Sequence, residues 1–201
     1  MTKTVSALYD TYDAASAAVS ALEAAGIPES EISMVANNSD NWHQGDRPGN
    51  AADGAGTGAG VGAAVGGVGG LLTGLGIRAI PGVGPVVAAG WLVATAVGAA
   101  AGAAVGGATG GLIASLTAAG VPEDDANLYA EGVRRGGTLV TARVDDARAS
   151  EAQSILQRQK AVDMVARGRA YRETGWSRFA TTAPAYTSDE IATERARYLN
   201  R

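Results

Sequence analysis

The chain has no cysteine and a single histidine, His43, among its 201 residues. The absence of cysteine excludes disulfides, thiol catalysis, iron–sulfur clusters and thiolate zinc sites. No second histidine exists to complete a metal site, and no serine or threonine forms a recognisable triad motif with His43, which is expected to be solvated. These absences predict no catalytic residue, no metal site and no cofactor, and therefore a non-enzymatic protein.

Basic residues are also scarce. The chain has 16 Lys and Arg residues against 20 Asp and Glu residues, and its isoelectric point is near 5.0. Because nucleic-acid binding depends on neutralising phosphates, this balance argues against nucleic acid as a partner. The first residues, MTKTVSALYD, lack the basic region and apolar run of a signal peptide. We therefore expect the protein on the cytoplasmic side of any membrane that it meets.

Charge is almost missing from the middle of the chain, where Arg78 is the only charged residue between residues 54 and 122. A solvated surface is not normally so poor in charge. Glycine recurs there at every fourth position, in two series separated by the sequence IPGVGP. The first series is Gly54, Gly58, Gly62, Gly66, Gly70 and Gly74, and the glycines of the second are Gly90, Gly98, Gly102, Gly106 and Gly110.

Such a block could be a phosphate-binding loop, a disordered linker or a pair of closely packed helices. A phosphate-binding loop needs a lysine, and none occurs between Lys3 and Lys160. The spacing also differs from that of a dinucleotide-binding loop. A linker would not carry a heptad stripe of large apolar residues, which here is Val61, Val65, Val68, Leu72 and Leu75.

The sequence therefore predicts a glycine-zipper helical hairpin over residues 54–120, with arms at 55–78 and 85–119. The predicted turn between the arms consists of Pro81, Gly82, Gly84 and Pro85. Because ridges without side chains let helices approach closely, the hairpin is expected to pack on itself and on other copies of the chain. Each arm is long enough to cross a bilayer, which favours membrane association. A soluble homo-oligomer or filament with the hairpins at its core explains the same residues.

The flanking segments alternate between strand and helix patterns. In the strand VSALY, Val5, Ala7 and Tyr9 are expected on one face, with Ser6 and Leu8 on the other. A helix follows, with Asp10 or Asp13 as its N-cap and an apolar stripe, and then the strand ISMVAN. After the glycine-rich block come the helix PEDDANLYAEGVRRG, the strand GTLVTARV, the helix DDARASEAQSILQRQ and a last strand, AVDMVAR. The apolar stripe of the first helix is Ala15, Ala18, Val19 and Leu22.

Two internal similarities connect these segments. SALEAAGIPESE resembles ASLTAAGVPEDD, and ISMVAN resembles VDMVAR. They predict an α+β fold in which a split ferredoxin-like β-α-β duplication is formed by residues 1–40 and 121–168. Residues 41–53 are a polar linker in this organisation.

Residues 169–201 form a tail rich in aromatic residues and arginine, which ends in a helix opened by the capping box of Thr187 and Glu190. Two interpretations are open for it. The tail is either a strap packed on the α/β domain of its own chain, or a segment that docks on a neighbouring subunit or an anionic lipid surface. The candidate docking residues are Trp176, Arg178, Phe179 and Tyr186.

Three longer stretches carry a resemblance to a known family: TVSALYDTYDAASAAVSALEAAGIPESEISMVA, GIRAIPGVGPVVAAG and AAGVPEDDANLYAEGVRRGGTLVTARV. Residues 4–160 resemble the bacterial general stress protein family of the heat-induced YflT type. The resemblance implies stress-linked expression and an α/β domain split by a glycine-rich hairpin, but no known reaction. We expect a stress-associated, self-assembling protein at a membrane, with a soluble assembly as the alternative. A small-ligand sensor is a third hypothesis, by analogy with ferredoxin-like regulatory domains.

Overall fold

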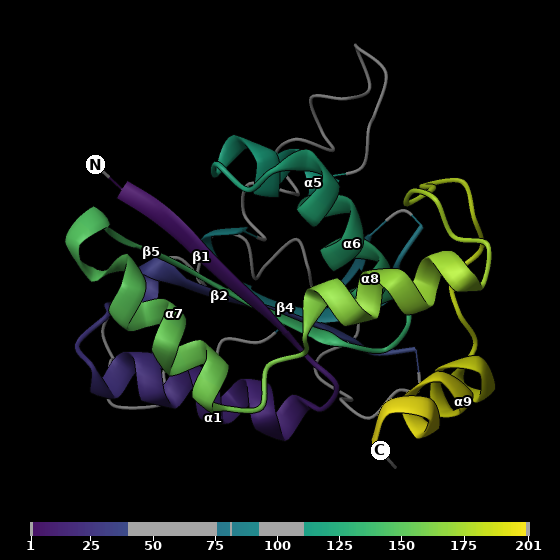
Figure 1. Ribbon diagram of the computed structural model, residues 1–201, viewed down its shortest axis with the longest axis horizontal. Coiled ribbons are helices and arrows are strands. Elements are labelled where there is room, and N and C mark those ends of the chain that lie inside the picture. Colours follow the sequence, from purple (N-terminus) through teal and green to yellow (C-terminus); the bar gives the residue numbers. More distant parts are fainter. Residues whose placement is uncertain (1, 40–75, 81, 93–110, 200–201) are drawn as a thin grey trace.

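The computed structural model describes residues 2–39, 76–80, 82–92 and 111–199, and these residues form a mixed α/β fold (Figure 1). Five strands make one antiparallel sheet in the order β1-β5-β2-β4-β3. Both β1 and β2 pair with β5, so a strand from the C-terminal half lies between two N-terminal strands. The strands are β1 (Thr2–Tyr9), β2 (Ile32–Asn37), β3 (Gly76–Ile80), β4 (Gly84–Gly90) and β5 (Thr138–Asp145).

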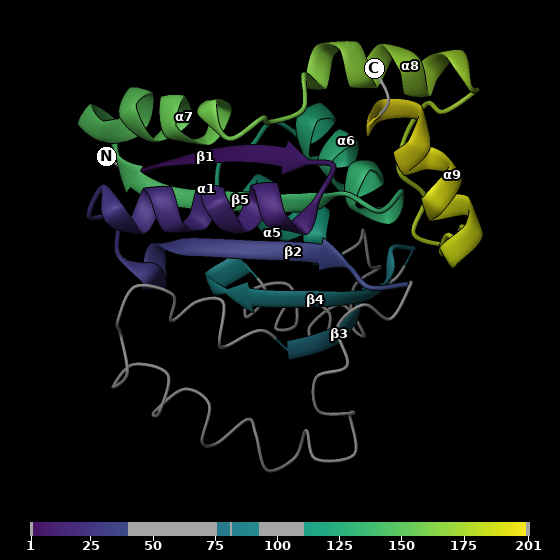
Figure 2. The ribbon, with the colours of Figure 1, turned by 90° about the horizontal axis from the view of Figure 1, so that it is seen from below.

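Helices cover both faces of the sheet and one of its ends (Figure 2). On one face lie α1 (Tyr12–Ala24) and α7 (Ala149–Arg158), and on the other α5 (Gly111–Ala118) and α6 (Glu123–Arg134). At the end of the sheet lie α8 (Met164–Glu173) and α9 (Ser188–Leu199). Short 3-10 turns precede β2 and α7, at Glu29–Glu31 and Asp146–Arg148.

Strand β1 supplies side chains to both hydrophobic cores, as its alternating sequence predicts. Val5, Ala7 and Tyr9 pack with α1 and α7, whereas Leu8 packs with α5 and α6. The Tyr9 hydroxyl donates a hydrogen bond to the Leu156 carbonyl oxygen at 2.8 Å. This bond lets a phenol lie in an apolar core, and burial raises the pKa of Tyr9. The predicted faces of β1 are confirmed.

Helix α1 buries the stripe that its sequence predicts, namely Ala15, Ala18, Val19 and Leu22. Its N-cap is Thr11, whose hydroxyl accepts a hydrogen bond from the Ala14 amide at 3.3 Å. The prediction of Asp10 or Asp13 as the cap is therefore wrong. Asp10 instead forms an ion pair with Arg167 of α8, at 2.8 Å. A distant cationic partner fixes that carboxylate, which helix-capping preferences alone do not reveal.

Residues 76–80 and 84–90 are the two strands of a β-hairpin, and the prediction that helical arms run through them is wrong. β4 lies between β2 and β3 in the sheet, with Val86, Val87, Ala88 and Ala89 buried. Valine suits such a strand because its branched side chain packs well on a pleated surface. The turn itself lies where the sequence predicts it, with Gly82 and Gly84 at φ of 75° and 101°. Pro85 is the second residue of β4, and Pro81 lies outside the described residues.

Gly90 has a different role from the one predicted for it in a helix-packing ridge. It lies opposite Ser33 of β2, and a Cβ atom on it would be 2.3 Å from the Ile32 carbonyl oxygen. Its missing side chain thus permits close approach of two strands. Helix α5 falls within the predicted second arm. The other ten glycines of the two series, and the linker 41–53, lie outside the described residues.

The prediction of a last strand at AVDMVAR is also wrong, because helix α8 begins within this segment. Asp163 caps that helix by accepting hydrogen bonds from the amides of Val165 and Ala166, at 2.9 and 3.0 Å. Before the cap, the Val162 amide donates one hydrogen bond to the Leu8 carbonyl oxygen, at 2.8 Å. The chain therefore touches the edge of β1 once and then turns into a helix.

Gly26 and Gly90 provide a matched test of this account of the sheet. Both have positive φ, 80° and 92°, but a Cβ on Gly26 would have nothing within 4 Å. Gly26→Ala should lower the unfolding free energy by about 1–2 kcal/mol, because alanine is strained in the left-handed conformation. Gly90→Ala adds the clash with β2 and should cost more than Gly26→Ala in urea unfolding. Equal losses for the two variants would contradict the close approach at Gly90.

Candidate functional site

The tail of the chain docks on one end of the α/β domain, where α8 and α9 lie (Figure 1, Figure 2). Residues 174–187, here called the strap, connect the two helices. The surface beneath the tail consists of the β3–β4 turn, the last turn of α6 and Gly136, and we call it the tail seat. It is the candidate site because it joins two groups of residues that the sequence singles out separately.

The strap lies directly against the glycines of the turn. A Cβ atom on Gly82 would be 2.7 Å from the Thr181 Cα atom and 2.9 Å from the Ala180 carbonyl oxygen. A Cβ atom on Gly84 would be 2.7 Å from the Ala185 side chain. Both glycines therefore serve two purposes, since they form the turn and leave room for the strap.

Two aromatic side chains anchor the strap. Phe179 is buried in the core cluster that includes Val83 of the turn and Val86 of β4. The Tyr186 ring lies under the Arg134 guanidinium at 5.0 Å, and burial raises the pKa of its hydroxyl. Arg134 also donates a hydrogen bond to the Pro184 carbonyl oxygen at 3.2 Å. Residues at both ends of the strap are thus held on the same chain.

Helix α9 is seated at Gly136, which follows α6 and has φ of 101°. A Cβ atom there would be 2.5 Å from the Ile191 side chain, so the absence of one makes the space that Ile191 occupies. The Gly136 carbonyl oxygen accepts a hydrogen bond from Arg195 Nη2 at 3.0 Å. A buried apolar contact and a polar one therefore locate α9 on the domain.

A buried cluster of charges lies between α6 and α9. Arg135 bonds Glu131 of its own helix at 2.7 Å and Glu194 of α9 at 3.1 Å. Its guanidinium lies over the Tyr171 ring at 4.1 Å and the Tyr186 ring at 5.6 Å. Burial by itself lowers the pKa of Arg135, but the bonds to Glu131 and Glu194 raise it above the ordinary value. Arg135 is thus charged at any physiological pH.

A second arginine clamp joins α8 to the domain. Arg167 donates two hydrogen bonds to the Asp10 carboxylate, at 2.8 and 2.9 Å, in the fork geometry that guanidinium groups favour. The same guanidinium lies over the Tyr198 ring of α9, at 3.6 Å. Arg167 therefore connects three segments: the β1–α1 loop, α8 and α9. Such clamps are specific, because lysine cannot reproduce the paired hydrogen bonds and the ring contact.

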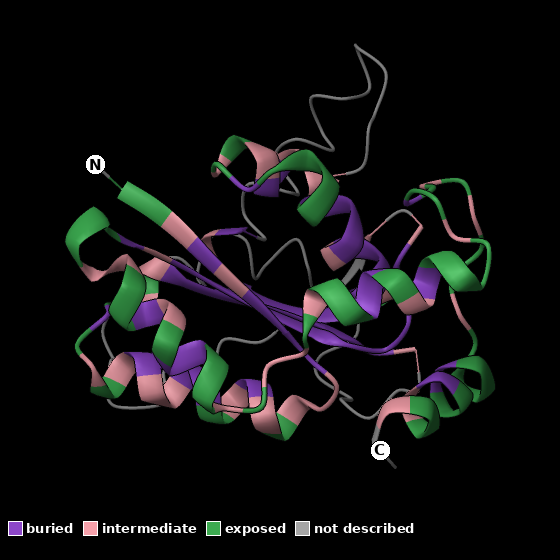
Figure 3. Cartoon of the chain, viewed as in Figure 1, coloured by how far each residue is buried: buried purple, intermediate pink, exposed green. Residues whose placement is uncertain are grey.

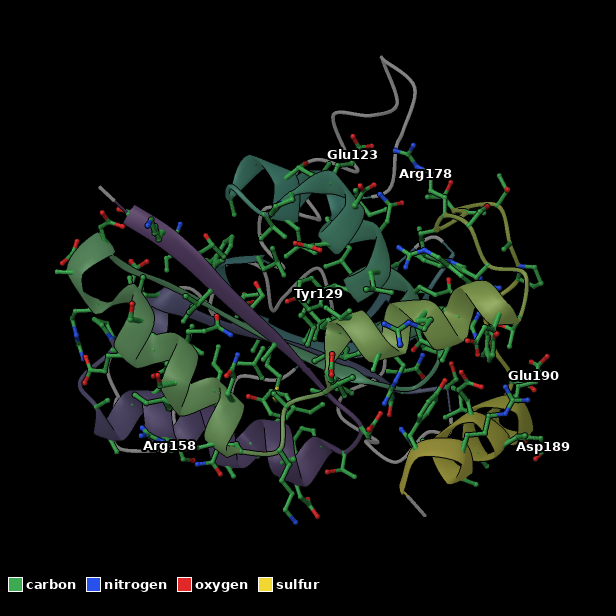
Figure 4. All side chains as sticks on the ribbon, in the orientation of Figure 1. Glu123, Tyr129, Arg158, Arg178, Asp189 and Glu190 are labelled. Carbon is green, nitrogen blue, oxygen red and sulfur yellow. The ribbon has the colours of Figure 1, made fainter. Side chains whose placement is uncertain are left out.

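An open groove of about 710 Å³ lies between α5, the start of α6 and the strap. Arg178 of the strap and Glu123 of α6 form an ion pair at its border, and Figure 4 shows the two side chains directed toward each other. Ile113, Val121 and Phe179 contribute apolar walls. The groove is a consequence of tail docking, because the strap forms one of its sides.

All four predicted docking residues lie against their own chain. Trp176 packs edge-on against Tyr171, with ring centroids 6.0 Å apart, and Arg178, Phe179 and Tyr186 make the contacts described above. This arrangement is the one expected if the tail is a strap packed on the α/β domain of its own chain. Docking on a neighbouring subunit or a lipid surface stays a prediction. The contact of Glu194 with Arg135 could not be predicted from the sequence, because the two residues are 59 positions apart.

Within the described residues, no group of three or more His, Asp or Glu side chains could hold a metal ion. Comparison of the chain with protein-family models, with curated proteins and with solved structures found no match. The fold and the site therefore define the protein as a mixed α/β domain with a tail docked across the turn of its β-hairpin.

The buried charge cluster predicts how the tail is released. In Glu194→Gln, Arg135 loses one of its two carboxylate partners, and we expect docking of α9 to weaken by about 1–3 kcal/mol. Trypsin should then cleave faster after Arg178 of the strap. Asp189→Asn is the matched control, because Asp189 lies on the exposed surface of the same helix (Figure 4). Equal cleavage rates in both variants and the native chain would show that the cluster does not hold the tail.

Proposed function

We propose that this is a non-enzymatic, stress-associated protein that self-assembles through its glycine-rich segments. The stress association rests on the family resemblance of the sequence. The self-assembly is supported by one observation about the sheet: Gly76, where the first segment ends, pairs with Ala88, two residues before the end of β4. The two glycine-rich segments therefore join the domain side by side, at the end of the sheet away from the turn.

This attachment suits two segments that pack on one another. Because the two segments are attached to neighbouring strands, bringing them together costs little chain entropy. Ridges of glycine then permit close backbone contact, and surplus ridges remain for other copies of the chain. The tail seat holds the opposite end of the same β-hairpin, which keeps the attachment points at a fixed separation.

Membrane association and assembly in solution are two settings for this function. In the part of the chain that the structure describes, no helix has the length and apolar character needed to span a bilayer. One base near the second attachment point supports assembly in solution. Arg143 lies over the Trp91 ring at 4.5 Å and pairs with Glu31 at 2.8 Å, so it is already engaged by a carboxylate. Bases engaged in this way are poorly suited to recruit anionic lipid headgroups.

We also infer that the domain derives from a split ferredoxin-like duplication. The position of β5 between β1 and β2 supports this origin, because it splits the first β-α-β unit as that fold requires. The second unit, β5 followed by α7, has no closing strand among the described residues, because α8 begins where that strand would lie. The β3–β4 hairpin extends the sheet at the other edge.

Substitution of two glycines tests the assembly. Gly102→Leu with Gly106→Leu places large side chains on one ridge and should sharply lower the particle mass measured by light scattering after size exclusion. Ala100→Leu with Ala104→Leu introduces the same two side chains at the same spacing, but it lies about 200° away around a helix and should have a smaller effect. An unchanged particle mass in the glycine variant would refute the proposal.

The same purified protein distinguishes the two settings. A uniform large particle in buffer without detergent indicates assembly in solution. Sedimentation with membranes, and release only by detergent, indicates insertion. The glycine variant should stay soluble and monodisperse if its smaller particle mass reflects lost packing, whereas aggregation would indicate misfolding.

A further inference from the structure

Strand β1 is an edge of the sheet, with β5 as its one neighbouring strand among the described residues. Two hydrogen bonds reveal which of its backbone groups point away from β5. The Leu8 carbonyl oxygen accepts from the Val162 amide at 2.8 Å, and the Ser6 carbonyl oxygen accepts from the Tyr129 hydroxyl at 3.2 Å. Because backbone direction alternates along a strand, the amides and carbonyls of Thr2 and Thr4 also point outward.

These outward groups are accessible at the first half of β1. Thr2 and Lys3 are exposed, and Thr4 and Ser6 are half-buried, as the green and pink start of this strand in Figure 3 shows. Within the described residues, no hydrogen bond engages the backbone of Thr2 or Thr4 on this side. An edge of this kind is a template for another strand.

The segment of this chain that could lie beside the first half of β1 is the one that follows α7, and it does not extend along that strand. Residues that follow α7 reach β1 only at Val162, opposite Leu8, and Asp163 then starts α8. The position beside Thr2–Ser6 is where the second β-α-β unit would place its closing strand. The fold thus has one strand position that its described residues leave open.

We propose that β1 of a second copy of this chain fills this position, in antiparallel register about a twofold axis. Among registers that pair outward-pointing residues, one sets Thr4 opposite Thr4 of the other copy and Thr2 opposite Ser6. Threonine and serine pairs are favourable cross-strand neighbours. The same register sets Lys3 opposite Val5, whereas a shift by one residue in each copy would set Lys3 against Lys3. Charge therefore selects the register.

The edge bears only weak protection against such pairing. Lysine on an edge strand commonly prevents association, but Lys3 is paired with Asp146 of its own chain at 2.6 Å, and the proposed register keeps it away from Lys3 of the other copy. The paired sheet would extend across both copies with every outward group of Thr2 and Thr4 satisfied. A second copy fits this edge because an isologous contact needs one self-complementary surface.

The position of this contact determines the form of the assembly. β1 is at one edge of the sheet, and the glycine-rich segments join β3 and β4 at the other. If the proposed function holds, each chain has two self-association surfaces on opposite sides. Copies then alternate between β1 contacts and glycine contacts, which generates a linear chain of subunits. The β1 dimer itself does not depend on the glycine-rich segments.

Thr4→Pro tests the contact in the full-length protein. Besides the hydroxyl, proline removes the outward amide of residue 4 and leaves the ladder to β5 intact, because the bonds of Ser6 and Leu8 place the even-numbered residues on the outward side. Thr4→Val is the matched control, because it loses the same hydroxyl bond to Ala119 but keeps the amide. In the Gly102→Leu, Gly106→Leu background we expect a dimer by light scattering, which Thr4→Pro converts to a monomer and Thr4→Val preserves.

A crosslink tests the register independently of stability. The native chain has no cysteine, so Thr4→Cys introduces a single thiol that would lie opposite its copy, within disulfide reach. Mild oxidation should give a covalent dimer. Thr2→Cys is the control, since the two copies of residue 2 would be four residues apart, about 13 Å along the strand.

The outcomes separate the two proposals. A double-glycine variant that is monomeric at every concentration, or equal crosslinking of Thr4→Cys and Thr2→Cys, would overturn the β1 contact. If the glycine substitutions leave the particle mass unchanged, the proposed function fails. Thr4→Pro should then still lower the particle mass relative to Thr4→Val, and the β1 contact is judged on that comparison.

Discussion

The backbone ladder of β5 is the interaction on which the rest of the structure depends. All eight residues of β5 pair with β1, and five of them also pair with β2 on the other side. Without β5, the two N-terminal strands have no backbone pairing that joins them, and each hydrophobic core loses the central strand between them. The strand alternates between both cores, with Val140 and Ala142 on one side and Leu139 on the other. One strand thus holds two faces and two halves of the chain together.

The tail uses a different kind of interaction to reach the same domain. Its contacts are mostly arginine with carboxylate, aromatic ring or backbone carbonyl, around a few apolar anchors such as Phe179 and Ile191. Arrangements of this sort add less net stability than a hydrophobic core of equal size, but they require a defined geometry. The tail is therefore held on the domain in a defined geometry.

The sequence predicts the local elements of this fold well, because periodicity is a local signal. The stripe of α1, the strands β2 and β5 and the capping box of Thr187 and Glu190 follow from neighbouring residues. The β3–β4 hairpin was missed because small residues at every fourth position suit a helix ridge, whereas Val86 and Val87 are drawn into the sheet by β2. The end of AVDMVAR was missed because the Asp163 cap competes with strand propensity.

The candidate site could be predicted only in part. The turn glycines and the aromatic tail each have a recognisable pattern, but their contact depends on tertiary structure. Gly82 shows this most clearly. The sequence around it predicts a turn, but it does not predict that Thr181 lies against this glycine. The Arg135–Glu194 pair is similar, because each partner alone looks like an ordinary surface charge on a helix.

The late position of β5 also orders events during synthesis. Roughly a hundred residues separate β2 from β5, so at about 5–20 residues per second the ribosome needs several seconds to deliver the central strand. During this interval β1, α1 and β2 cannot complete their sheet, while the glycine-rich segments have already been made. If the glycine-rich segments associate as proposed, a newly made chain has these segments complete before its domain closes. Neighbouring chains on one polysome would then meet through those segments first, and the place of one strand in the sequence would tie assembly to translation.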